Sequence, residues 1–279
     1  MDTARDAPGR VSSISETEER AIAQLVESCA TDDRIAALFL GGSRARGEDD
    51  EYSDIDLCVI VRDHAYDDVI AGRDALARTL GEPLFLEDFG NGNMAFVILA
   101  DGTELEFNYF AEGDLDAIRS GPYRVLLDKD GILANRAFPL PEADRTAQVE
   151  ALRDILLWFW HDVGHFTTAV GRGQLWWAAG QLEQLRAYCV NLIRIDQGDA
   201  AEDEPYWKLD HEIATEALDG LRSTFVPVER DALLRAGGVA LGFFRERAPS
   251  VARAFGLPYP AELDRLVGGH LEHLIEASG

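Results

Sequence analysis

The feature that most constrains the fold is a strand–turn–strand pattern at residues 39–60, FLGGSRARGEDDEYSDIDLCVI. The apolar run at 35–40 predicts a buried strand, because short apolar runs bounded by turn residues are typical of strands inside a sheet. This strand ends at a Gly-Gly-Ser turn, residues 41–43, and a second apolar run follows at 55–61. Bare backbone N–H groups, a hydroxyl and the missing Cβ suit a phosphate, so we expect the turn to bind one.

Two aspartates, Asp54 and Asp56, stand at the start of the second strand. Since side chains alternate across a strand, both carboxylates project from one face, and Ile55 and Leu57 project from the other. Two ionised carboxylates about 5–7 Å apart repel each other unless a cation lies between them. Hard oxygen ligands of this kind suit Mg²⁺, which proteins hold with one or two carboxylates and substrate phosphates. The pattern therefore predicts a nucleotide–metal site.

A family resemblance rests on the same residues. Gly42-Ser43, a spacer and then Asp54-Ile55-Asp56 resemble the signature of the DNA polymerase β-like nucleotidyltransferase superfamily. Residues 33–37 (DRIAA) and 47–55 (GEDDEYSDI) resemble the lincosamide nucleotidyltransferases most closely, and the aminoglycoside adenylyltransferases are similar too, but less so. A weaker resemblance continues at residues 171–194. The resemblance implies an enzyme that uses two Mg²⁺ ions and a nucleoside triphosphate, ATP or another NTP.

The resemblance also implies a third carboxylate on a strand beside the aspartate pair. Residues 103–110 alternate cleanly, with apolar side chains on one face and Glu104, Glu106 and Asn108 on the other. Glu106 stands between two apolar residues and matches the superfamily pattern. Glu104, on the same face, and Asp114, which follows a glycine, remain alternatives.

The turn residues are the expected ligands of the triphosphate. Gly42 and Ser43 would offer backbone amides and a hydroxyl to the β- and γ-phosphates, aided by a helix that starts there. Arg44 and Arg46 follow at once. They either contact the triphosphate or lie in a solvated loop.

The remaining patterns predict an α+β protein. Residues 1–140 form a nucleotidyltransferase domain with a mixed sheet and helices, and residues 141–279 form an all-α helical bundle that binds the acceptor. Asp101-Gly102 indicates a hairpin with a two-residue type I′ turn. Strands are expected at 35–40, 55–62, 84–86, 94–100 and 103–110, and residues 125–133, with a turn at 128–131, close the first domain. Helices are expected at 16–30 (with a Ser15–Glu18 capping box), 67–80, 114–120, 145–170, 174–195, 209–218, 228–246 and 260–277.

The net charge of −25 narrows the range of partners. A chain this acidic repels nucleic acid and anionic membranes and attracts polycations such as aminoglycosides. An acidic solvation shell for a salt-rich cytoplasm is the better explanation of the charge as a whole, so the charge supports a cationic substrate only weakly. No apolar run reaches the ~18–20 residues that cross a bilayer, the N-terminus has no secretory signal, and the three cysteines form no metal pattern. We therefore expect a cytoplasmic protein with reduced, partly buried thiols, and its oligomeric state stays open.

Several residues of the helical half are candidates for other roles. His161 and His165 have a spacing able to bind zinc, but the sequence shows no third ligand and no H-E-x-x-H motif. Asp162 and Glu183 could bind a substrate ammonium group. The tryptophans are expected mainly in the core or between helices, with one or two lining an antibiotic cleft: Trp158, Trp160, Trp176 and Trp177.

The function predicted from these residues is Mg²⁺-dependent transfer of a nucleoside monophosphate, AMP from ATP, to a hydroxyl of a small antibiotic. Asp54 and Asp56 would hold the metal, and Glu106 would complete a two-metal site or act as general base. One alternative is a nucleotidyltransferase that modifies a protein or RNA in a regulatory or toxin–antitoxin system. Another is a nucleotide-binding module of the same fold without turnover.

Overall fold

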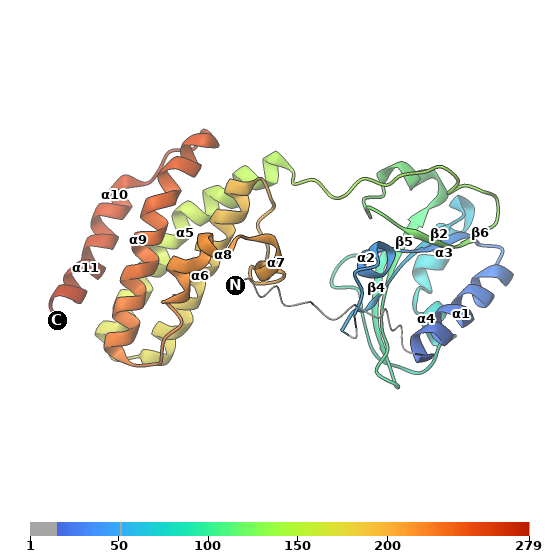
Figure 1. Ribbon diagram of the computed structural model, residues 1–279, viewed down its shortest axis with the longest axis horizontal. Helices are drawn as coiled ribbons and strands as arrows, with labels where there is room; N and C mark the ends of the chain where they lie inside the picture. The colour runs from blue at the N-terminus through green and yellow to red at the C-terminus, as the bar shows by residue number, and fades with distance from the viewer. Residues whose placement is uncertain (1–15, 51, 279) are drawn as a thin grey trace, which may run out of the picture. The chain divides into compact units, whose positions relative to one another are not determined.

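The computed structural model describes residues 16–50 and 52–278 (Figure 1). The chain forms two compact units, Met1–Pro141 and Glu142–Gly279. The first contains a sheet with helices, and the second is helical throughout its regular structure. The expected α+β class is confirmed. The proposed capping residue Ser15 lies outside the described residues.

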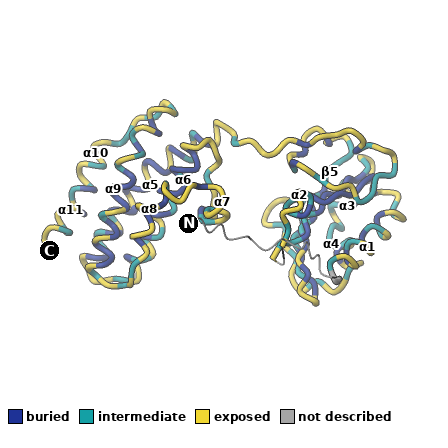
Figure 2. Tube along the Cα trace, viewed as in Figure 1, coloured by how far each residue is buried: buried dark blue, intermediate teal, exposed yellow. Residues whose placement is uncertain are grey.

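The sheet of the first unit is mixed. Its six strands are β1 (Ile35–Leu40), β2 (Ile55–Val61), β3 (Pro83–Glu87), β4 (Met94–Leu99), β5 (Glu104–Ala111) and β6 (Arg124–Asp128). Their order is β3-β4-β5-β2-β1-β6. The central β2–β5 pair is parallel, and the other neighbouring pairs are antiparallel. In Figure 2 the strands around β5 are largely buried.

Helices α1 (Glu16–Thr31), α3 (Tyr66–Ala71) and α4 (Asp74–Arg78) cover one face of the sheet. The prediction of a single helix at 67–80 was wrong, because the structure has two helices there, α3 and α4, with a break between them. Glycine at position 72 weakens a helix by about 1 kcal/mol relative to alanine. The buried Tyr109 hydroxyl donates to the Arg73 carbonyl at 2.8 Å, which stabilises the break.

The opposite face is covered only in part. The short 3-10 helix Glu112–Ala117 and the loop after β6 place Leu115, Leu133 and Phe138 against the middle of the sheet. Strand β6 ends at Asp128, where the turn expected at 128–131 begins, and the Asp128 carboxylate accepts the backbone N–H groups that follow this turn. The start of β2 on this face carries acidic rather than apolar side chains.

The β4–β5 hairpin differs from the expected type I′ turn. A type I′ turn needs positive φ at both central residues, but of these only Gly102 has one, at 86°. The Gly102 N–H donates to the Leu99 carbonyl at 2.9 Å, and the Asp101 carboxylate accepts the Thr103 N–H at 3.0 Å. The aspartate side chain therefore holds a longer turn with a single left-handed glycine.

The second unit is a helical bundle built mainly on α5, α6 and α9 (Figure 1). Its helices are α5 (Arg145–Gly171), α6 (Leu175–Gln197), α7 (Leu209–Glu212), α8 (Thr215–Arg222), α9 (Arg230–Ala254), α10 (Ala261–Leu263) and α11 (Gly269–Glu276), with a π-helical turn at Asp264–Gly268. The helix expected at 209–218 is split in two. The helix expected at 228–246 continues through Pro249, because Val251 and Ala252 extend its buried face.

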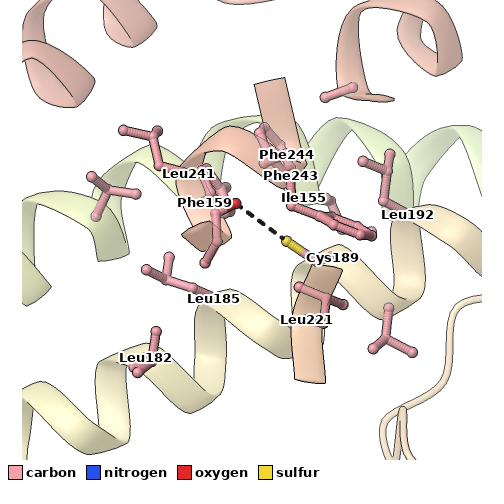
Figure 3. Packing of buried hydrophobic residues seen from close by; sticks show 14 of the residues in the cluster. Ile155, Phe159, Leu182, Leu185, Cys189, Leu192, Leu221, Leu241, Phe243 and Phe244 are labelled. Carbon is pink, nitrogen blue, oxygen red and sulfur yellow. Dashed lines mark hydrogen bonds between the residues drawn. The ribbon is translucent and has the colours of Figure 1, made fainter. Parts of the chain in front are cut away.

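The core of the bundle is mostly aliphatic and includes stacked aromatic rings (Figure 3). Phe159 of α5 and Phe244 of α9 stack with ring centroids 3.6 Å apart, and the Cys189 thiol points at the Ala240 carbonyl, 3.8 Å away. Of the four tryptophans expected mainly in the core or between helices, the structure buries only one. Trp160 is buried, but Trp158, Trp176 and Trp177 have exposed fractions of 51%, 84% and 37%.

The cysteines are free thiols. Cys29, Cys58 and Cys189 are all buried and none forms a disulfide. Burial in apolar surroundings disfavours the thiolate and raises the pKa of Cys29 to about 12, with the Asp32 charge adding to the effect. Within the described part of the chain, no helix has both the length and the apolar character needed to span a bilayer.

Candidate active site

The Gly-Gly-Ser turn lies directly against the aspartate pair. Strand β1 ends at Leu40 and helix α2 (Gly42–Arg46) follows. The Gly41 N–H donates to the Asp56 carbonyl at 3.0 Å. Gly42 has a left-handed φ of +57°, and a Cβ built on it would lie 1.6 Å from Asp56 Oδ2. Glycine is therefore required at position 42 for two reasons: the backbone angle is left-handed, and the Asp56 carboxylate occupies the space that a side chain would need.

Three carboxylates converge beside this turn. Asp54, Asp56 and Glu106, the acidic triad, each offer an oxygen, and these oxygens all lie within 4.8 Å of one another. The parallel pairing of β2 and β5 places Asp56 directly opposite Glu106. Residues opposite each other in register share a face of the sheet, so the fold brings together acids that are some 50 positions apart in the sequence.

The two alternative third acids lie elsewhere. Glu104 is exposed and pairs with Ile98 at the outer end of β5, and Asp114 is exposed in the 3-10 helix after that strand. Neither belongs to a metal-sized cluster among the residues that the structure describes. Geometry therefore favours Glu106 as the third acid.

Asn108 is a site residue that the sequence analysis did not select. Its side-chain amide donates to Glu106 Oε1 at 2.7 Å, which orients that carboxylate. Its position two residues after Glu106 on the same strand face was the available signal.

The carboxylates also affect the pKa of the neighbouring Cys58 thiol. Burial first, and then the charges of Asp56 and Glu106, raise the pKa of the Cys58 thiol to about 12.

Arg44 fixes the backbone that carries the first aspartate. Its guanidinium is buried and donates to the carbonyl of Asp54 at 2.8 Å and to the carbonyl of Ser53 at 2.6 Å. It also forms an ion pair with Glu18 of α1 at 2.7 Å. Arg46 is exposed and donates to Glu48. Of the two arginines considered as triphosphate ligands, Arg44 forms internal hydrogen bonds, whereas Arg46 is exposed.

Exchanging each arginine for alanine is expected to give different results. Arg44→Ala removes three part-buried hydrogen bonds and leaves acceptors unpaired, so we expect a loss of about 2–3 kcal/mol in the free energy of unfolding. Arg46→Ala should leave stability unchanged and raise the KM for nucleotide about tenfold, as expected for one lost charge-assisted phosphate contact. Urea unfolding and initial rates measure the two effects. Equal stability of both variants would contradict the role of Arg44.

A pair of glycines tests the contact between the turn and the triad. Gly42 and Gly47 both have left-handed φ, but a Cβ on Gly47 would meet nothing within 4 Å. Alanine at either position incurs backbone strain of about 1 kcal/mol. Only Gly42→Ala also displaces Asp56, so we expect it to lower kcat about 100-fold or more, whereas Gly47→Ala stays close to wild type. Similar kcat values for the two variants would contradict the placement of Asp56.

The comparison with known families decides the class of this site. A family model described as streptomycin adenylyltransferase matches residues 15–274. The chain belongs to the streptomycin adenylyltransferase family. It is therefore a member of a nucleotidyltransferase family of enzymes, and the expected resemblance to such enzymes is confirmed. Of the two groups that the motifs resemble, the match is to an aminoglycoside-modifying one. No curated protein matches the chain.

Solved structures resemble this adenylyltransferase-family chain at low sequence identity. An aminoglycoside 6-adenyltransferase from Bacillus subtilis is 16% identical, with a TM-score of 0.40 over 93% of this chain and 98% of that one. A nucleotidyltransferase-like protein from Exiguobacterium sibiricum is 13% identical, with a TM-score of 0.39 over 84% and 77%. A putative nucleotidyltransferase from Sulfolobus solfataricus is 18% identical, with a TM-score of 0.29 over 48% and 100%.

The acids expected to bind a substrate ammonium are engaged within the helical unit. Glu183 forms an ion pair with Arg186, one turn along α6. Asp162 is buried and accepts a hydrogen bond from the Tyr188 hydroxyl at 3.0 Å. Their part in acceptor binding stays a prediction.

Proposed function

We propose that the protein transfers AMP from ATP to a hydroxyl of a small aminoglycoside-type antibiotic in a Mg²⁺-dependent reaction. The observation that carries this proposal is the acidic triad seated against the Gly42–Ser43 turn. A turn without side-chain bulk beside clustered carboxylates suits a phosphate chain and its metal ion together.

The triad fits Mg²⁺ on the chemistry of its donor set. Three half-buried carboxylates whose oxygens lie within 4.8 Å repel one another unless a cation neutralises them. All three offer hard oxygen ligands, as Mg²⁺ requires. Asp54, Asp56 and Glu106 would hold the ion, which would supply charge neutralisation on the phosphate oxygens.

The protein groups around the triad would position the reactants. The Ser43 hydroxyl and the backbone amides of the turn would bind the β- and γ-phosphates, and Arg46 is the accessible cation next to them. Glu106, oriented by Asn108, would either complete the metal site or accept the proton of the attacking hydroxyl. Arg44 holds the Asp54 backbone in place. Rate enhancement would come from positioning and electrostatics, without a covalent intermediate.

The acceptor class rests on the family and on charge. The family description names streptomycin, and a net charge of −25 favours a polycation over nucleic acid. Modification of a protein remains the second candidate, since the triad would serve any hydroxyl acceptor. The complete triad argues against a nucleotide-binding protein of this fold that lacks catalytic activity, because such a protein would not need three clustered carboxylates.

A substrate screen tests the proposal. The chain is incubated with Mg²⁺ and each of ATP, GTP, CTP and UTP, together with a panel of aminoglycosides and lincosamides, and pyrophosphate release is followed. We expect release with ATP and an aminoglycoside, and a product heavier by one AMP in mass spectrometry. Release with ATP that labels only proteins would overturn the antibiotic assignment. Absence of pyrophosphate release with every nucleotide and every acceptor would overturn the proposed transfer reaction.

A further inference from the structure

A second cluster of metal-ligating groups lies in the helical unit. His161 and His165 stand one turn apart on α5, with ring centroids 4.1 Å apart. Asp162 lies beside them. Each of the three residues offers one ligand atom, and these atoms lie within 4.8 Å of one another. The sequence showed the two histidines at a zinc-binding spacing without a third ligand, and the structure adds the third as a carboxylate.

Contacts with neighbouring side chains orient the Asp162 carboxylate. Asp162 is only 8% exposed. Its Oδ1 lies 2.7 Å from His161 Nδ1, and its Oδ2 accepts the Tyr188 hydroxyl of α6 at 3.0 Å. The Tyr188 bond is of the type that commonly orients a metal ligand from behind, whereas the His161 contact joins two of the proposed ligands directly. Burial of a carboxylate next to two imidazoles also favours a cation at this position.

Aromatic rings restrain both imidazoles. The Trp158 ring packs edge-on against His161, with centroids 5.0 Å apart, and the Trp177 ring lies 5.5 Å from His165. His161 itself is exposed, so the cluster opens to solvent on one side. Three protein ligands with an open position are the donor set of many zinc sites, with the remaining position left for water or another ligand.

We propose that His161, Asp162 and His165 form a binding site for a divalent transition-metal ion of the zinc type, Zn²⁺, Ni²⁺ or Cu²⁺. Imidazole favours these ions, whereas all-oxygen donor sets favour Mg²⁺. The chain therefore carries two sites that select different metals, the acidic triad for Mg²⁺ and this cluster for a nitrogen-preferring ion. The proposal stands apart from the transfer reaction, because it rests on donors of the helical unit alone.

Tryptophan fluorescence reports this site selectively. All five tryptophans lie between residues 158 and 207, so none belongs to the unit that carries the acidic triad. Two of them contact the histidines. The full chain is titrated with Ni²⁺ in the presence of millimolar Mg²⁺, which occupies the triad. We expect saturable quenching at one ion per chain, reversed by a chelator and prevented by an excess of Zn²⁺.

Matched histidine variants locate the ion. His161→Ala/His165→Ala is compared with His270→Ala/His273→Ala, which removes an exposed pair on α11. We expect the first variant to weaken Ni²⁺ binding at least about tenfold and the second to leave it unchanged. The single variants His161→Gln and His165→Gln, checked by circular dichroism, guard against misfolding. Absence of saturable quenching in the wild type, or equal quenching in the first variant, would overturn the proposal.

The carboxylate has its own test. Asp162→Asn keeps the shape of the side chain and can still accept from Tyr188, but it removes the charge. We expect Ni²⁺ affinity to fall about tenfold while the fold is retained. Unchanged affinity would reduce the site to two histidines and overturn the assignment of Asp162.

Discussion

Replacing Asp54 or Asp56 by asparagine is expected to abolish nucleotidyl transfer and to leave the chain folded. Each change removes one negative charge from three carboxylates that lie within 4.8 Å. An amide is a poor ligand for Mg²⁺ beside a polyanionic substrate, so we expect turnover to fall by at least about 10³-fold. Pyrophosphate release at saturating ATP, Mg²⁺ and acceptor measures the loss.

Measuring thermal stability distinguishes the loss of a metal ligand from damage to the fold. Since like charges at close range destabilise a protein without its metal, Asp54→Asn and Asp56→Asn should raise the melting temperature in a chelator or leave it unchanged. The control Asp67→Asn changes an exposed acid of α3 and should retain full activity. Wild-type turnover in either triad variant would refute the metal-binding assignment.

Glu106→Gln is expected to reduce turnover by about two to four orders of magnitude, whether Glu106 is a metal ligand or a general base. The glutamine keeps the length of the side chain and can still accept from Asn108, so the strand should stay intact. The charge alone is lost, opposite Asp56 in the parallel β2–β5 pair. Single-turnover measurements with preformed ATP complex isolate this loss from nucleotide binding.

The same strand supplies the control. Glu104 stands two residues earlier, on the same face, but it is exposed and lies outside the acidic triad. Glu104→Gln should therefore leave turnover within about twofold of wild type. If Glu104→Gln is inactive and Glu106→Gln is active, the third acid has been assigned to the wrong position on β5.

Local patterns in the sequence were enough for most of the elements. Alternation placed Asp54 and Asp56 on one face and identified residues 103–110 as a strand, because the two-residue period of a strand is a local property. The 3.6-residue period also predicted the two long helices α5 and α6, but the helix expected at 209–218 is split in two and the helix expected at 260–277 contains a π-helical turn. Errors arose where a side chain intervened, as at the helix break beside Tyr109 and at the turn held by Asp101.

The sequence by itself determined the α+β class of the protein. It also identified the glycine–serine turn, the aspartate pair and three candidates for a third carboxylate. The motif already favoured Glu106 among these candidates, but only the tertiary structure placed it directly opposite Asp56, through the register of β5 against β2. It also committed Arg44 to the Asp54 backbone and brought Asp162 to the two histidines. The reason is physical: spacing along a chain fixes which face a side chain takes, whereas its neighbour across the sheet or bundle depends on pairing between distant segments.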